Sequence, residues 1–335
     1  MRNSLYVIGL SLVLISCGAK KEINKTQISP KPVAQKPVEA PRPPIRHDVK
    51  GGEYYTVNIS DPNKNDNTIS YGSIVSANPK GYTITKNYFP AVAQNFRQKY
   101  VILHYTAIDH DKSVRVLTTQ SVSAHYLVND LDDSEIYQLV DENKRAYHAG
   151  ISEWRKDVGL NDTSIGIEIV NNGFTEQGGK KTFYPFPDYQ VKKVAELVKD
   201  LVNRYKISPT NVLAHSDIAP TRKQDPGPLF PWKKLYDEYG IGMWYDDAAK
   251  QAFLTQIIPE DFTAKFNDAA FVMKVQIELK KFGYTSLSES GVWDKATQST
   301  IEALQYHFRP ENYDGKLDME TWAILQALNQ KYSTK

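Results

Sequence analysis

Two histidines and one aspartate are the residues of this chain best suited to chemistry. His104 follows the apolar run at residues 100–103, and His215 follows the apolar run at residues 212–214. Asp225 lies further along the second segment, in a turn rich in proline. Two imidazole nitrogens and one carboxylate oxygen form a ligand set that zinc accepts, with a fourth position left for water. The residue types therefore indicate a metal site that is open to catalysis.

These three side chains need a rigid scaffold that brings distant segments together. Short apolar, β-branched runs typical of buried strands occur at residues 100–103, 126–128, 136–140, 165–170 and 211–214. Residues 189–205 repeat apolar side chains at helical spacing. Strands mixed with helices predict an α/β fold with a mixed central sheet flanked by helices. Because strand ends project side chains from a rigid scaffold, we expect His104 and His215 to meet in one cleft.

The segment at residues 215–232 is expected to be a stiff loop without regular structure. Proline fixes φ and removes a backbone donor, and this segment carries Pro220, Pro226, Pro228 and Pro231. Such a loop suits a site whose atoms must stay in place. It also contains Lys223, which by itself indicates only an exposed turn lysine.

Glu168 is a second candidate for chemistry. It lies between Ile167 and Ile169 in a predicted strand, so alternation points it away from both of them. That direction fits a cleft or plain solvent. The pairing of His104 with His215 favours the cleft.

The other histidines and a nearby carboxylate fit structural roles better. His125 is flanked by apolar and aromatic neighbours, which is typical of a packed group or of a group that supports a ligand. Asp217 is a rival carboxylate for the metal, but its closeness to His215 favours a contact within the turn. His110 and His307 are interpreted as incidental.

Several short motifs resemble the type-2 N-acetylmuramoyl-L-alanine amidases. They are VILHYT at 101–106, SAHY at 123–126, YHAG at 147–150, SIGIE at 164–168, AHSD at 214–217 and KQDPG at 223–227. The resemblance implies a zinc enzyme whose ligands correspond to His104, His215 and Asp225. The implied reaction is hydrolysis of the amide between the lactyl group of N-acetylmuramic acid and L-alanine, in peptidoglycan or muropeptides.

The same resemblance implies roles for three further residues. Glu168 corresponds to the catalytic acid, which takes a proton from water and passes it to the leaving nitrogen. Lys223 corresponds to the lysine that stabilises the developing oxyanion. His148 corresponds to a position that lines the substrate groove. No motif indicates a cofactor other than Zn2+.

Residues 257–335 are predicted to form a small three-helix C-terminal domain. Apolar faces recur at helical spacing near residues 271–282, 301–308 and 319–328. The order of GVWD at 291–294, DG at 314–315 and TW at 321–322 resembles the type 1 peptidoglycan-binding module. The alternative is a helical appendage that completes the core of the main domain.

Residues 1–17 are predicted to be a lipoprotein signal. Arg2 and a short apolar run precede LISC at 14–17, and Cys17 is the only cysteine, so it forms no internal disulfide. Lipidation of Cys17 is the favoured interpretation, and an uncleaved anchor or an ordinary signal is the alternative. Gly18 next to Cys17 favours an anchor in the outer membrane, facing the periplasm. Residues 18–53 form a Pro/Lys-rich linker, which is either an extended tether or a disordered tail.

The sequence thus predicts a zinc amidase domain at residues 54–256 and a peptidoglycan-binding helical domain at residues 257–335. The net charge of +2 gives no electrostatic argument for nucleic acid. The expected partners are peptidoglycan or muropeptides and a membrane reached through the lipid anchor, and we expect a monomer. The alternative functions are a non-catalytic peptidoglycan recognition lipoprotein and a zinc peptidase that cuts the stem peptide, although no HExxH motif is present.

Overall fold

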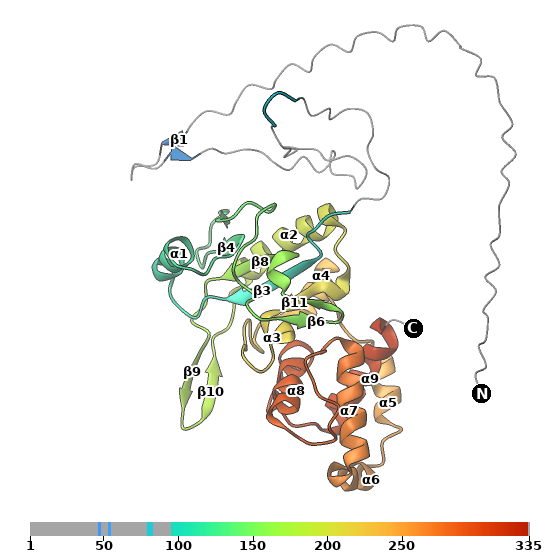
Figure 1. The fold of residues 1–335 in the computed structure, drawn as a ribbon. Helices are drawn as coiled ribbons and strands as arrows, with labels where there is room; N and C mark the ends of the chain where they lie inside the picture. Colours follow the sequence, from blue (N-terminus) through green and yellow to red (C-terminus); the bar gives the residue numbers. More distant parts are fainter. Residues whose placement is uncertain (1–45, 48–52, 55–78, 83–94, 334–335) are drawn as a thin grey trace, which may run out of the picture. The chain divides into compact units, whose positions relative to one another are not determined.

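The computed structural model describes residues 46–47, 53–54, 79–82 and 95–333 (Figure 1). The chain divides into residues 1–57 and residues 58–335. In the first part, β1 (Arg46–His47) pairs antiparallel with β2 (Glu53–Tyr54). The predicted signal, Cys17 and most of the predicted linker lie outside the described residues. Among the helices described, none combines the length and the apolar character needed to cross a membrane.

A five-stranded sheet forms the centre of the second part (Figure 1). Its strands, from one edge to the other, are β11 (Val212–Ala214), β3 (Tyr100–Tyr105), β8 (Ser164–Ile169), β4 (Tyr126–Val128) and β5 (Tyr137–Gln138). The first four strands run parallel to one another, and β5 runs antiparallel to β4. The predicted mixed α/β sheet is confirmed.

Three of the five strands match the predicted runs to within one residue at each end, and β3 and β5 differ by more. β3 continues past His104 to Tyr105, so this histidine lies inside the strand rather than after it. β5 is shorter than the predicted run at residues 136–140, because the N–H groups of Leu139 and Val140 donate to the carbonyl of His125.

Helices cover the sheet. α2 (Asp188–Tyr205) packs against β3, β4 and α4 (Trp232–Tyr239), and it buries the predicted stripe, including Val194, Val198 and Leu201. The remaining elements of this region, which the sequence did not predict, are α1 (His110–Thr119), α3 (His215–Ile218), the hairpin of β6 (Glu153–Trp154) and β7 (Asp157–Val158), and the hairpin of β9 (Phe174–Gln177) and β10 (Lys180–Phe183).

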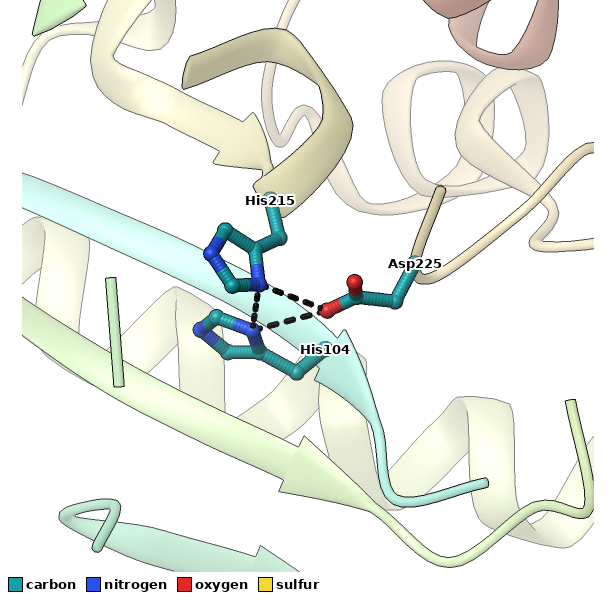
Figure 2. A group of neighbouring side chains, drawn as sticks. All are labelled: His104, His215 and Asp225. Carbon is teal, nitrogen blue, oxygen red and sulfur yellow. Dashed lines mark hydrogen bonds and ion pairs between the residues drawn. The ribbon is translucent and has the colours of Figure 1, made fainter. Parts of the chain in front are cut away.

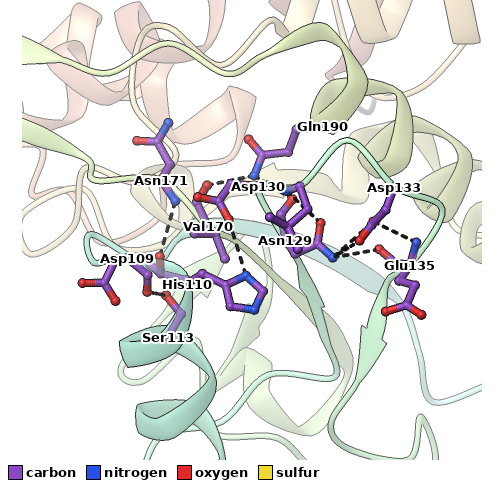
Figure 3. Close-up of polar contacts among 12 residues, drawn as sticks. Asp109, His110, Ser113, Asn129, Asp130, Asp133, Glu135, Val170, Asn171 and Gln190 are labelled. Carbon is purple, nitrogen blue, oxygen red and sulfur yellow. Dashed lines mark hydrogen bonds and ion pairs between the residues drawn. The ribbon is translucent and has the colours of Figure 1, made fainter.

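The polar turn at residues 129–135, between β4 and β5, is held from both sides (Figure 3). The side-chain amide of Gln190 on α2 donates to the carbonyls of Asn129 and Val170 at 3.1 and 2.8 Å. At the start of α1, Nδ1 of His110 lies 3.4 Å from Oδ1 of Asp130. His110 is therefore a structural residue of this turn.

The predicted C-terminal helices are α7 (Ala269–Phe282), α8 (Lys295–Phe308) and α9 (Met319–Tyr332), preceded by α5 (Asp247–Leu254) and α6 (Pro259–Ala264). Asp268, Asp294 and Asp318 cap the three helix N-termini, each accepting a bond from a backbone N–H of the first turn. α7 packs against α9, whereas α8 packs against α3 and α4. Buried side chains of the sheet and of these helices form one continuous apolar cluster.

Candidate metal centre and active site

His104, His215 and Asp225 come together at one point (Figure 2). Nδ1 of His104 lies 2.9 Å from Nδ1 of His215 and 2.9 Å from Oδ2 of Asp225. Nδ1 of His215 lies 3.0 Å from the same carboxylate oxygen. All three residues are buried.

Neighbouring parallel strands bring the two histidines together. Leu103 of β3 is the register partner of Ala214 of β11, so the next residues, His104 within β3 and His215 at the start of α3, lie side by side. His215 opens the short helix α3, so the expectation of an irregular loop is wrong at its start. The N–H of Ser216 on α3 donates to the carbonyl of Asp225 at 3.0 Å, which ties the third member of the group to the first two.

The ring orientation of His215 is set by a backbone carbonyl. Its Nε2 lies 3.1 Å from the carbonyl oxygen of Ala149, which can only accept. Nε2 therefore carries the proton, and Nδ1 presents a lone pair to Asp225.

A chain of hydrogen bonds sets the orientation of His104 in the same way. Oγ of Ser164 donates to the carbonyl of Leu160 at 2.6 Å, so it accepts from Nε2 of His148 at 3.1 Å. Nδ1 of His148 then accepts from Nε2 of His104 at 3.0 Å. The Nδ1 of His104 is left with a lone pair directed at the other two atoms. A bond to the second ring nitrogen is the usual way in which a metal-binding histidine is oriented.

The electrostatics of the group fit a bound cation. Burial, and then His215, lower the pKa of His104 to about 4, so its imidazole is neutral at neutral pH. Three lone-pair atoms at 2.9 to 3.0 Å with no hydrogen between them repel one another. A divalent metal ion removes that repulsion, so these residues fit a metal centre.

Glu168 lies beside this centre. It is the register partner of His104 on the neighbouring strand β8. The side chain is partly buried, and its Oε2 is buried without a hydrogen-bond partner among the described residues. Burial, and then the charge of Asp225, raise the pKa of Glu168 well above its ordinary value, while Lys223 opposes the shift. The carboxyl group therefore keeps its proton to a higher pH than an exposed glutamate does.

One face of β8 builds much of the site. Ser164, Gly166 and Glu168 alternate along the strand, so their side-chain positions lie on the same side of the sheet. A Cβ added at Gly166 would lie 2.4 Å from the ring of His148. Glycine is thus required there, because the imidazole that supports His104 lies directly on the backbone.

The group opens into a cleft of about 250 Å³. Glu168, Lys223 and His148 all line it, together with the exposed side chain of Tyr147. His148 is buried with both ring nitrogens bonded to protein groups. The contact of His148 with substrate stays a prediction. The structure shows instead that His148 contacts His104.

Three residues from the sequence analysis lie outside the three-atom group. His125 is buried and packed, with Nδ1 accepting from the N–H of Gly166 and Nε2 near the carbonyl of Lys144. Asp217 contacts its own turn, as predicted, by accepting from the N–H of Ala214 at 2.8 Å. His307, which was interpreted as incidental, is fully buried, and its Nδ1 lies 2.7 Å from Oδ2 of Asp217. No local pattern around His307 indicates this contact.

Two family models match this chain. The family model described as N-acetylmuramoyl-L-alanine amidase matches residues 94–228, and the one described as putative peptidoglycan binding domain matches residues 268–325. Both matches fall inside the predicted domains, whose boundaries stay predictions.

Individual relatives cover more of the chain. It is 43% identical over 241 residues to the N-acetylmuramoyl-L-alanine amidase AmiD of Escherichia coli, covering 70% of this chain and 84% of AmiD. Among solved structures, it is similar to AmiD from E. coli in complex with the substrate anhydro-N-acetylmuramic acid-L-Ala-D-gamma-Glu-L-Lys. That likeness has a TM-score of 0.67 and 41% identity, over 76% of this chain and 97% of the other. AmpDh3 from Pseudomonas aeruginosa gives a TM-score of 0.63 at 39% identity, over 77% and 99% of the two chains.

Proposed function

Since the chain belongs to the N-acetylmuramoyl-L-alanine amidases, we propose that it cleaves the amide between the muramic lactyl group and L-alanine at a zinc centre held by His104, His215 and Asp225. The observation that carries the proposal is the set of three lone-pair atoms at 2.9 to 3.0 Å from one another. Two imidazoles and one carboxylate are a donor set that suits zinc and leaves a position open. When bound, the ion supplies a Lewis acid for the scissile carbonyl and a water of near-neutral pKa.

Glu168 is the proton carrier in this proposal. Its Oε2 takes the proton of the attacking water and passes it to the leaving nitrogen of L-alanine. Two features support this role: Oε2 has no competing partner among the described residues, and its pKa is raised by burial. A raised pKa makes the carboxylate a stronger base for the proton of the water, which it then gives to the leaving nitrogen.

Lys223 provides positive charge on the cleft wall. The scissile carbonyl oxygen becomes negative when water adds to the carbon, and a fixed cation stabilises that charge. Lys223 lines the same cleft as Glu168 and His104, which supports this role.

The substrate class follows from the relatives. AmiD has been solved with an anhydro-N-acetylmuramic acid peptide as substrate, and AmpDh3 with an anhydromuramic pentapeptide. We extend this class to the present chain, so that its substrates are peptidoglycan and the muropeptides derived from it.

The test uses purified sacculi and soluble muropeptides, with product masses compared before and after treatment with a chelator. We expect stem peptides with a free L-alanine amine, loss of release after chelation, and recovery on addition of zinc. Cuts inside the stem peptide would instead identify a peptidase. A protein that binds sacculi and releases nothing, with or without zinc, would be a recognition protein, which the complete group of three ligands and Glu168 argues against.

We also propose that the mature chain is anchored to the outer membrane through lipid on Cys17 and faces the periplasm. The support is the sequence pattern LISC at 14–17 followed by Gly18. Cys17→Ser should move the protein from the outer-membrane fraction to the soluble periplasmic fraction. A Cys17→Ser variant that still separates with the outer membrane would contradict the anchor.

A further inference from the structure

We propose that the C-terminal helices are part of the metal centre's support: through His307 and Tyr284 they fix Asp217, and Asp217 fixes the turn that presents His215. The inference rests on the proposed metal site. It gives this module a role in positioning a ligand, in addition to any role in holding peptidoglycan.

Asp217 is the link between the two regions. It lies two residues after His215 on α3, and its side chain is fully buried. Oδ2 accepts from the N–H of Ala214 at 2.8 Å and from Nδ1 of His307 at 2.7 Å. Oδ1 accepts from the hydroxyl of Tyr284 at 2.9 Å. A buried carboxylate needs such donors, and two of the three belong to the C-terminal module: His307 lies on α8, and Tyr284 lies just after the end of α7.

The ring of His307 is held in place by stacking. It lies parallel to the ring of Phe308 at 4.0 Å between centroids, and it stacks on Trp232 of α4 at 3.9 Å. The Nε2 of His307 has no hydrogen-bond partner among the described residues, so Nδ1 makes its one hydrogen bond, to Asp217. Stacking prevents rotation of the ring, and burial keeps water from replacing Asp217 as the partner of Nδ1.

Tyr284 is fixed by a second contact between the regions. Its buried ring meets Trp154 of β6 edge-on at 5.2 Å, and the indole N–H of Trp154 donates to the carbonyl of Thr210. Next to it, Arg155 donates to the carbonyls of Phe282 and Tyr332 at 3.3 and 3.0 Å. The β6–β7 hairpin thus holds the end of α7 and the end of α9 against the sheet domain.

The consequence reaches His215 through one backbone bond. Asp217 holds the N–H of Ala214, the residue before the ligand, so the start of α3 is fixed by a carboxylate that the module orients. If His307 and Tyr284 no longer donate, the carboxylate keeps one partner and can turn. The Nδ1 of His215 then loses its fixed position relative to His104 and Asp225. Asp217, His307 and Tyr284 do not line the cleft, so they are positioning residues.

The test measures zinc affinity by competition with a chromogenic chelator, using the full mature chain and no substrate. Tyr284→Phe removes one hydroxyl and keeps the ring against Trp154. His307→Phe keeps a stacked ring and removes the Nδ1 donor. The matched control is Tyr332→Phe, which removes a hydroxyl bonded to the backbone of Trp244, also at the junction between the regions but away from α3.

We expect each test variant to bind zinc about tenfold more weakly, as is typical when a group that supports a ligand is lost, and the control to bind it as the wild type does. Excess zinc should restore hydrolysis of soluble muropeptides by Tyr284→Phe, which a loss of peptidoglycan binding would not allow. Zinc affinity equal to wild type in a folded Tyr284→Phe variant overturns the inference, even if His307→Phe fails to fold. The readout is metal binding, so the inference can be tested even without amidase activity. A wild-type chain that binds zinc but hydrolyses no muropeptide would contradict the proposed function and leave the inference standing.

Discussion

His104 and Glu168 are register partners across the parallel strands β3 and β8, so one strand pairing places the imidazole of a proposed metal ligand beside the carboxyl group that we propose as the proton carrier. Paired residues of adjacent strands project from the same face of a sheet. Their separation is therefore set by the backbone ladder rather than by loops. The imidazole of His104 and the carboxyl group of Glu168 are therefore held next to each other without a conformational change.

The first prediction concerns the proton carrier. Glu168→Gln keeps the size and polarity of the side chain but cannot accept the proton, so muropeptide hydrolysis should fall by about 10²- to 10⁴-fold. Zinc content, measured by atomic absorption on the same sample, should stay at the wild-type level because Glu168 is not among the three ligands. Hydrolysis at the wild-type rate would show that another group carries the proton.

The same substitution should stabilise the metal-free protein at neutral pH. Burial raises the pKa of Glu168 above its ordinary value of 4.5, so above that pH the folded state keeps a proton that the unfolded chain has released. Burying Glu168 therefore costs no folding free energy from its ionisation below pH 4.5. As the pH rises above 4.5, the free energy of unfolding of the wild type falls. Metal-free Glu168→Gln should melt above wild type at pH 7, and the two melting temperatures should converge as the pH falls toward 4.5. A difference in melting temperature that does not change with pH would contradict the assignment of the buried charge.

The third prediction tests the support of His104. Gly166→Ala places a methyl group 2.4 Å from the His148 ring, which must move and release Nε2 of His104. We expect zinc affinity to fall by about 10- to 100-fold. Gly178→Ala is the control, because its added Cβ meets nothing within 4 Å, although its positive φ makes that substitution strained too. Both variants should lose some thermal stability, and only Gly166→Ala should lose zinc; equal zinc affinity in the two would remove His148 from the metal site.

The sequence predicted the meeting of His104 and His215 because both have a local signal. His104 and His215 both follow apolar β-branched runs, and strands of that kind pair in the centre of an α/β fold. Glu168 alternates with two isoleucines, so its direction was readable, although only the strand order shows that it faces His104. The family resemblance added the roles, which residue types alone could not distinguish.

The contact between Asp217 and His307 had no such signal. Ninety residues separate the partners along the chain, and the contact depends on how α8 packs against α3. Such a contact is set by tertiary packing, which neither periodicity nor local propensity encodes. The helix α3 was missed for a different reason, because the prolines that predicted irregular structure begin at Pro220, after the helix has ended.

The last prediction uses the charge of Lys223. This lysine lowers the pKa of Glu168 against the larger effect of burial, so Lys223→Met should raise that pKa further. If hydrolysis needs Glu168 unprotonated at the start, the ascending limb of the pH–rate profile must move to higher pH. The loss of the cation should also reduce kcat by about 10²-fold at every pH, since the oxyanion loses its stabilising charge. Lys180→Met, which removes an exposed lysine from β10, is the control and should leave kcat and the ascending limb of the pH–rate profile unchanged. A reduced kcat with an unmoved limb would mean that Lys223 stabilises the oxyanion without acting on Glu168, and an unchanged kcat would remove it from the reaction.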